Sequence, residues 1–159
     1  MTPSAEPDLR IEVSIAKQEL RLFKDGVCVC KTAVSSAAAG LGSAEGSWKT
    51  PTGRFLIQEK IGEGAPLHTI FRGRQPRGVY RGALTSDGPK TDAILTRILW
   101  LHGLEEQNAN TYGRYIYLHG THAEDRIGTP ASHGCIRLPN AAMKSLFDQV
   151  TLGTEVVIV

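Results

Sequence analysis

The residues best suited to chemistry lie close together in the second half of the chain. Cys135 follows a glycine in Ser132-His133-Gly134-Cys135, and that glycine allows a tight turn from which the thiol can project. A thiol beside an imidazole suffices for nucleophilic catalysis, because the thiolate attacks and a neighbouring protonated histidine lowers its pKa. We therefore predict Cys135 as the nucleophile, with a buried structural cysteine as the alternative, and His119 as the base that takes its proton.

Supporting roles are assigned to the neighbours of the cysteine. The N–H groups of Gly134 and Cys135 are expected donors to the oxyanion of a tetrahedral intermediate. Ser132 is expected to orient the loop, and His133 to hold the loop or line the pocket, with a second base as the alternative. Arg137 is a bidentate donor close to the nucleophile and is predicted to bind a substrate carboxylate; the alternative is an ordinary surface arginine.

A zinc site is the competing interpretation of these residues, since His122 lies near His119, His133 and Cys135. The spacing contains neither C-x-x-C nor H-E-x-x-H, and a glycine-rich loop is a poor metal cage. We therefore expect no metal and no cofactor.

A strand and a loop must bring these residues together. Tyr115, Tyr117 and His119 alternate with apolar residues, which predicts a strand with these three side chains on one face. Tyr117 thereby becomes a candidate substrate contact. The loop of residues 120–131 contains Gly and Pro and is long enough to return Cys135 to this strand.

Apolar alternation or continuous apolar runs predict further strands at 11–15, 20–22, 27–34, 55–61, 94–101 and 155–159, with a hairpin turn at Asp25-Gly26. One helix is predicted from Ala141 to about Val150, with Asn140 as its N-cap. Residues 35–47 are expected to be a mobile loop, either a plain connection or a flap bordering the substrate. Residues 62–92 are expected to be irregular and to form a rim of the active site. The fold class is mainly β, sandwich-like or barrel-like, with one helix near the C-terminus.

Arg97 lies in the apolar strand 94–101, where a buried cation needs a partner. An ion pair with Asp or Glu and the binding of a substrate carboxylate both satisfy that need. Cys28 and Cys30 are two apart on a predicted strand, so their side chains should share one face. We interpret them as small half-buried apolar residues, with a CxC redox pair or metal clip as the alternative.

Composition bounds the class of protein. A chain of 159 residues predicts a single domain, which we place at residues 10–159 after a disordered arm at 1–9. A net charge of +2 without a basic stripe argues against a nucleic-acid partner, and no apolar run approaches a membrane span. The start, MTPSAEPDLRIEV, lacks the apolar core of a signal peptide. We therefore expect a cytoplasmic location, with a removed leader and a periplasmic location as the alternative.

Two motifs carry a family resemblance. His119-Gly120-Thr121 followed by Ser132-His133-Gly134-Cys135-Ile136-Arg137-Leu138 resembles the signature of the L,D-transpeptidase (YkuD-type) catalytic domain. Thr50-Pro51-Thr52-Gly53-Arg54-Phe55 resembles a second landmark of that family, and the resemblance runs from about Ile11 to the C-terminus. It implies a mainly-β catalytic fold, Cys135 as nucleophile, His119 as base, and orientation of that histidine by the carbonyl of Gly120.

The resemblance also implies an enzyme that acts on the peptide stem of bacterial cell wall and reacts with carbapenems. Cys135 would attack the carbonyl of the L-centre of meso-diaminopimelate in a tetrapeptide stem, releasing D-alanine and leaving a thioester. Water as acceptor gives L,D-carboxypeptidase activity, whereas an amine gives a 3→3 crosslink, a lipoprotein anchor or D-amino-acid exchange. Because no export signal and no wall-binding repeat is seen, we expect hydrolysis of muropeptide fragments. Periplasmic transpeptidation is the alternative, and a non-catalytic muropeptide-binding module or a redox protein is more remote.

Overall fold

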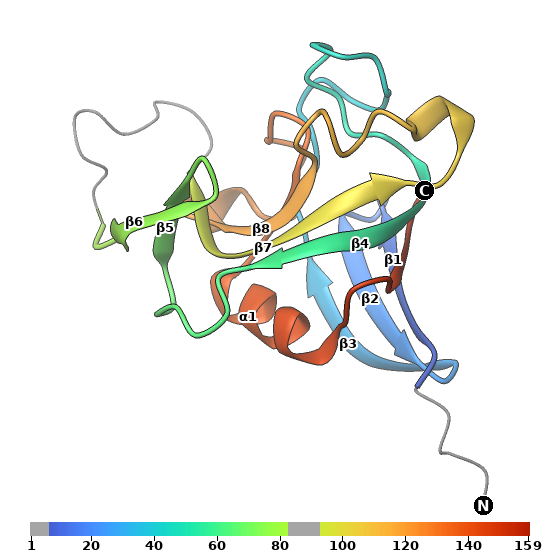
Figure 1. The fold of residues 1–159 in the computed structure, drawn as a ribbon. Coiled ribbons are helices and arrows are strands. Elements are labelled where there is room, and N and C mark those ends of the chain that lie inside the picture. Colours follow the sequence, from blue (N-terminus) through green and yellow to red (C-terminus); the bar gives the residue numbers. More distant parts are fainter. Residues whose placement is uncertain (1–6, 83–92) are drawn as a thin grey trace, which may run out of the picture.

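A curved β-sheet dominates the molecule, and a single α-helix packs on its concave side (Figure 1). This is a computed structural model, and it describes residues 7–82 and 93–159. The predicted fold class, mainly β with one helix near the C-terminus, is confirmed. No helix in these two ranges is long and apolar enough to cross a membrane.

The strands within the described ranges are β1 (Leu9–Ser14), β2 (Glu19–Lys24), β3 (Val27–Ala33), β4 (Gly53–Ile61), β5 (Thr69–Arg72), β6 (Gln75–Val79), β7 (Ile94–Gly103), β8 (Tyr117–Thr121), β9 (Ile136–Leu138) and β10 (Glu155–Ile158). The helix is α1 (Asn140–Gln149), and η1 (Glu106–Asn108) and η2 (Glu124–Arg126) are short 3-10 turns. The predicted hairpin is present, with Asp25 and Gly26 at φ 51° and 80° between β2 and β3.

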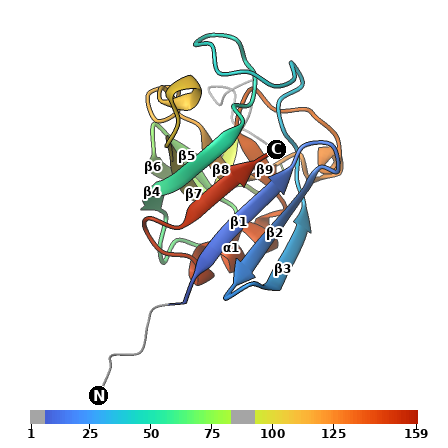
Figure 2. The same ribbon diagram turned by 90° about the vertical axis from the view of Figure 1, so that its right-hand side faces the viewer.

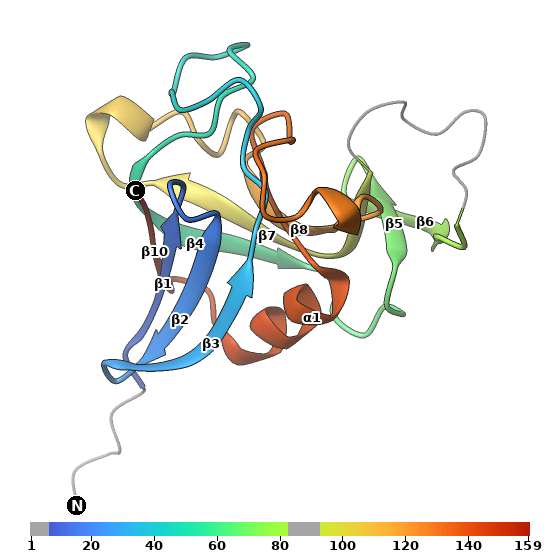
Figure 3. The ribbon, with the colours of Figure 1, turned by 180° about the vertical axis from the view of Figure 1, so that it is seen from behind.

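The sheet runs β3-β2-β1-β10-β4-β7, and β8 and β9 extend it beyond β7 (Figures 2 and 3). β10 pairs parallel with β1 and antiparallel with β4, so the last strand of the chain joins its first three strands to the rest. Beyond β3, Ser35 and Arg137 exchange two backbone hydrogen bonds of 2.9 Å. This bridge draws the β3 end of the sheet to β9 and gives the fold its barrel-like curvature.

The core fills the space between the sheet and α1. Side chains alternate along each strand, so Ile11, Val13 and every second residue of the neighbouring strands face the core. From α1, Met143, Leu146 and Phe147 face the same core at helical spacing. Burying one such large side chain contributes about 1.5–3 kcal/mol. The helix is therefore held by its apolar face, and it packs against β7 and β8, the strands next to the site.

The predicted irregular segment contains a hairpin, so that prediction was wrong for β5 and β6. Gly73 and Arg74 form its turn, with φ of 55° and 65°, and Ile70 pairs with Leu95 of β7. Pro76 and Gly78 interrupt β6 and obscure its alternation in the sequence. Residues 83–92 of the predicted rim lie outside the described residues, as do residues 1–6 of the predicted arm.

Asn140 is not the N-cap that was predicted. The helix begins at Asn140 itself, after Pro139, whose carbonyl accepts the first helical hydrogen bond from the Met143 N–H at 2.9 Å. The Asn140 side chain turns to the sheet instead. Its Oδ1 accepts from Thr96 Oγ1 at 2.6 Å, and its Nδ2 donates to the Thr121 carbonyl at 2.7 Å. A buried amide thus ties the start of α1 to β7 and β8.

The strand register also contradicts the expectation that the side chains of Cys28 and Cys30 share one face. Cys30 pairs with Leu22 and Cys28 pairs with Phe23, because a bulge interrupts the β2–β3 register at this point. Leu22 and Phe23 are consecutive, so the two cysteines lie on opposite faces rather than on one. Cys30 packs against the core, Cys28 is exposed, and both are free thiols. This arrangement does not suit a shared metal clip.

Candidate active site

Cys135 lies in the turn just before β9, and main-chain groups of the neighbouring segment hold its sulfur. The N–H of Tyr117 donates to Cys135 Sγ at 3.3 Å, and the sulfur lies 3.4 Å from the Tyr115 carbonyl oxygen, which accepts from the thiol. The cysteine is half-buried. Two main-chain groups therefore fix the position of the sulfur.

His119 is fully buried in the middle of β8. Its Nδ1 lies 2.6 Å from the carbonyl oxygen of Gly120. A proton on Nδ1 satisfies that carbonyl and leaves the basic lone pair on Nε2. Gly120 has no room for a side chain, since a Cβ there would lie 2.2 Å from Asn140 Oδ1. The bond between β8 and α1 therefore also fixes the backbone that orients the imidazole.

The parallel register of β8 and β9 brings the predicted residues together. Leu118 pairs with Ile136 and His119 with Arg137, which places Tyr117 opposite Cys135 one step earlier. Side chains alternate along a strand, so Tyr117, His119, Cys135 and Arg137 point to the same face, and neighbouring strands lie roughly 4.8 Å apart. The candidate nucleophile, candidate base and candidate carboxylate ligand thus share one side of a two-strand ribbon. Arg137 is buried there.

Two hydroxyl groups brace the cysteine loop. Ser132 Oγ donates to the Cys135 carbonyl at 2.6 Å and accepts from the Gly134 N–H at 3.2 Å. Thr50 Oγ1 donates to the Gly134 carbonyl at 2.9 Å and accepts from the Ala37 N–H at 2.9 Å. The Gly134 N–H, one of the two expected oxyanion donors, therefore points to a hydroxyl of its own loop.

The first residues of the small-residue stretch after β3 pack against the cysteine loop. Ala37 pairs with Ser132, and the Ser36 carbonyl accepts from the N–H groups of Ala131 and Ser132 at 2.8 and 2.9 Å. Ser35, Ser36 and Ala37 are buried. The expectation of a mobile loop was wrong for these residues, because their unbranched side chains let two backbones approach closely. The run of small residues was the one feature of the sequence that could have indicated this close packing.

His133 is exposed and makes an edge-on ring contact with Trp48, with centroids 5.2 Å apart. Both line a hollow of about 290 Å³ together with Arg114 and Tyr115. Arg114 donates to the Lys49 carbonyl at 2.8 Å. Burial lowers the pKa of Arg114, and negative charge on Cys135 acts in the opposite direction, so this cation lies within electrostatic reach of the thiol.

An aromatic wall covers the other side of the thiol. Trp100 stacks on Tyr112 at 4.1 Å between centroids and meets Tyr117 edge-on at 5.3 Å and Tyr115 at 5.7 Å. Tyr117, expected as a substrate contact, is buried in this wall, and burial raises its pKa. Its hydroxyl accepts a hydrogen bond from Arg74 at 3.3 Å. Sequence patterns gave no indication of Arg74, which belongs to the unexpected hairpin.

Arg97 is not brought to this site. It is buried on the helix side of β7, with its guanidinium carbon 5.5 Å from the Phe147 ring centroid and Nη1 donating to the Thr96 carbonyl at 2.6 Å. Cys135 packs instead with Ile98 and Trp100 on the other face of β7. Within the described ranges, no carboxylate lies within ion-pair distance of Arg97.

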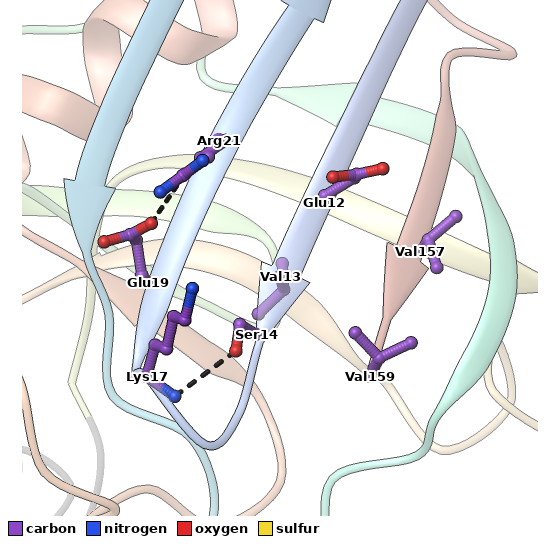
Figure 4. A pocket seen from close by; sticks show the side chains of 8 residues that line it. All are labelled: Glu12, Val13, Ser14, Lys17, Glu19, Arg21, Val157 and Val159. Atoms are coloured by element: carbon purple, nitrogen blue, oxygen red, sulfur yellow. Dashed lines mark hydrogen bonds and ion pairs between the residues drawn. The ribbon is translucent and has the colours of Figure 1, made fainter. Parts of the chain in front are cut away.

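Another hollow, of about 260 Å³, lies on the outer face of β1, β2 and β10 (Figure 4). Its charged lining includes Glu19 and Arg21, which form an ion pair at 2.6 Å, and it contains no thiol or histidine. It is therefore separate from the cysteine site. Among residues 7–82 and 93–159, no group of three or more His, Cys, Asp or Glu side chains is arranged to hold a metal ion.

The structure is thus a mainly-β domain with a thiol and a carbonyl-braced imidazole on one strand pair. The sequence profile of the YkuD family, the L,D-transpeptidase catalytic domain, matches residues 8–158. The chain therefore belongs to this family of enzymes.

Individual relatives support this assignment. The chain is 30% identical over 155 residues to the probable L,D-transpeptidase YcfS of Escherichia coli K12, covering 94% of this chain and 43% of that protein. It is 42% identical over 48 residues to the putative L,D-transpeptidase YqjB of Bacillus subtilis, covering 30% of this chain and 27% of that one. The match to YcfS thus spans less than half of the length of that relative.

Solved structures show the same fold. An L,D-transpeptidase from Xylanimonas cellulosilytica superposes with a TM-score of 0.62 at 21% identity, covering 99% of this chain and 63% of that one. L,D-transpeptidase 3 from Mycobacterium tuberculosis, in complex with a faropenem-derived adduct, gives a TM-score of 0.62 at 17% identity. The match covers 96% of this chain and 60% of that one. At this level of identity the likeness concerns the fold alone.

Proposed function

We propose that Cys135 forms a thioester with the peptide stem of peptidoglycan. The supporting observation is a sulfur held by the Tyr117 N–H on the same strand face as His119, whose Nδ1 lies on the Gly120 carbonyl. His119 takes the thiol proton, and the sulfur attacks the carbonyl at the L-centre of meso-diaminopimelate. The C–S bond forms, the C–N bond to D-alanine breaks, and the proton passes to the departing amine.

The acceptor decides the product. A thioester is open to water without any further binding surface, so hydrolysis to a tripeptide, an L,D-carboxypeptidase activity on muropeptide fragments, is our first candidate. Transfer to an amine of a second stem is the second candidate, and the names of the relatives, probable and putative L,D-transpeptidases, favour it. Both products require the same acylation by Cys135.

The test is incubation with purified disaccharide tetrapeptide, with and without a D-amino acid or a second stem in excess, followed by mass analysis. Tripeptide as the main product in both arms supports hydrolysis, whereas exchanged or crosslinked product supports transfer. Cys135→Ala should form neither product while keeping the circular dichroism of the wild type. Turnover by Cys135→Ala would rule out the nucleophile.

Acylation itself is open to a direct test. A carbapenem should add covalently to Cys135, and intact-protein and peptide mass spectrometry identify the modified residue. Cys28 and Cys30 act as internal controls, because both are free thiols on a strand remote from the motif. An adduct at either of them, with Cys135 unmodified, would contradict the proposed pocket.

A further inference from the structure

Arg74, at the tip of the β5–β6 hairpin, is held over the aromatic wall in a defined position. Its guanidinium carbon lies 5.0 Å from the Trp100 ring centroid and 5.3 Å from that of Tyr115. Its Nη1 donates to the Tyr117 hydroxyl at 3.3 Å. Flat contact with aromatic rings and one hydrogen bond restrict a side chain that would otherwise be flexible.

The residues beneath Arg74 are those that hold the thiol. Tyr117 donates its N–H to Cys135 Sγ, and the Tyr115 carbonyl accepts from the same sulfur. Arg137, by contrast, pairs with His119, two residues further along β8. The site therefore has one arginine toward the Tyr115 end of β8 and another toward the His119 end. The hairpin lies beside β7 and β8 in Figure 1.

In the part of the chain that the structure describes, no carboxylate lies within ion-pair distance of Arg74. Glu59 attracts Arg74 from further away, and its carboxylate accepts a hydrogen bond from the Tyr112 hydroxyl. A guanidinium is a permanent cation, and the hydrogen bond with Tyr117 raises the pKa of Arg74 further. A guanidinium has five N–H donors, and the described contacts use one of them.

We propose that Arg74 is a specificity-determining residue that binds a carboxylate of the peptide stem beside Cys135. The inference rests on the proposed function. The stem has two carboxylates near the bond that breaks, one at the terminal D-alanine and one at the D-centre of meso-diaminopimelate. Arg74 lies beside the residues that hold the thiol, and planar bidentate pairing with a carboxylate is the chemistry that guanidinium groups favour.

The experiment measures kcat/KM on four peptides, namely the tetrapeptide, its amide at the D-alanine carboxyl, its amide at the diaminopimelate D-centre, and the double amide. Arg74→Gln should lower kcat/KM roughly tenfold to a hundredfold for peptides with one particular carboxylate, mainly through KM. It should leave kcat/KM unchanged for peptides in which that carboxylate is amidated. Arg74→Lys should lower kcat/KM by a smaller factor than Arg74→Gln. The matched control is Arg72→Gln, an exposed arginine of the same hairpin, which should match the wild type on all four.

Equal losses on all four peptides would mean that Arg74 only supports the hairpin, and no loss on any would mean that it does not bind substrate. Either result overturns the inference. Urea unfolding of the Arg74→Gln protein, compared with the wild type, shows whether its fold is kept. A wild-type enzyme that turns over none of the peptides would instead refute the proposed function. If the wild type has different kcat/KM values on the four peptides and Arg74→Gln has the same values as the wild type, the role of Arg74 is refuted and the proposed function stands.

Discussion

The contacts that hold Cys135 and His119 come from main-chain groups more than from side chains. An N–H and a carbonyl from residues 115–117 contact the sulfur, and another carbonyl lies against His119 Nδ1. Main-chain partners have no side-chain signature, so sequence patterns do not identify the residues that supply them. The side chains whose replacement should matter are the imidazole and the hydroxyls of the loop.

His119→Ala should lower turnover by roughly 100-fold or more, because general-base catalysis contributes factors of that size. It should also slow the alkylation of Cys135 at a fixed pH, because no imidazole is then present to take the thiol proton. The rate of iodoacetamide labelling measures this change. His133→Ala is the control and should have the smaller effect, because His133 is exposed beside Trp48. The reverse order would mean that the roles of the two histidines are exchanged.

Thr50→Val should loosen the cysteine loop at nearly constant volume. It removes the hydroxyl that joins the Ala37 N–H to the Gly134 carbonyl and leaves both buried groups unsatisfied. The expected cost is about 1–3 kcal/mol in the free energy of unfolding, with a fall in turnover. Urea unfolding and steady-state kinetics check both values. Thr52→Val, in the same TPTG segment, has no such bridge and should be close to neutral.

At the scale of elements, α1 is fastened to the sheet by polar contacts that are buried at its start and part-buried at its end. Asn140 bonds to Thr96 and Thr121 at its start. Lys60 of β4 donates to the carbonyls of Phe147 and Val150 at 2.7 and 2.6 Å at its end, where a cation also complements the helix dipole. The helix is therefore positioned by groups that lie far from it in sequence.

Lys60→Met should leave those two carbonyls without a donor and lower the free energy of unfolding by about 1–3 kcal/mol. Lys24→Met, at the exposed end of β2, is the control and should have little effect. Burial lowers the pKa of Lys60, so the unfolded chain binds more protons than the folded chain just below the ordinary lysine pKa. This group therefore makes stability rise with pH in that alkaline window. Urea titrations of the wild type and Lys60→Met at increasing pH should show a more positive slope of stability against pH in the wild type.

At the scale of the whole molecule, β10 holds the sheet together. It lies between β1 and β4, with Val156 opposite Ile11 and Phe55, whereas Val157 lies opposite Glu12 and Arg54. Val156 is fully buried, and Val157 lines the outer hollow. The order of the sheet thus depends on the final residues of the chain.

Val156→Asn should reduce the free energy of unfolding by roughly 3 kcal/mol or more, because it loses apolar burial and buries an amide. Val157→Asn should change it by less than about 1 kcal/mol, since that side chain faces outward. Urea unfolding of the two variants provides the comparison. Similar losses at both positions would indicate a register different from the one described.

The sequence by itself determined the site motif and most strands, because both depend on short-range patterns. Ser-His-Gly-Cys and His-Gly-Thr are contiguous, and the alternation of Ile11 and Val13 or the Asp25-Gly26 turn is legible within a few residues. The β5–β6 hairpin escaped prediction because Pro76 and Gly78 interrupt the same kind of pattern.

Only the tertiary structure decided which distant groups meet. The register of β8 and β9 places Arg137 beside His119 and leaves Arg97 on the far face of β7. A bulge separates Cys28 from Cys30, and Asn140 bonds to the sheet instead of capping its helix. Each outcome depends on pairing between segments far apart in the chain. The physical reason is that strand periodicity specifies the two faces of one strand, while a partner strand selects the register and therefore the neighbours.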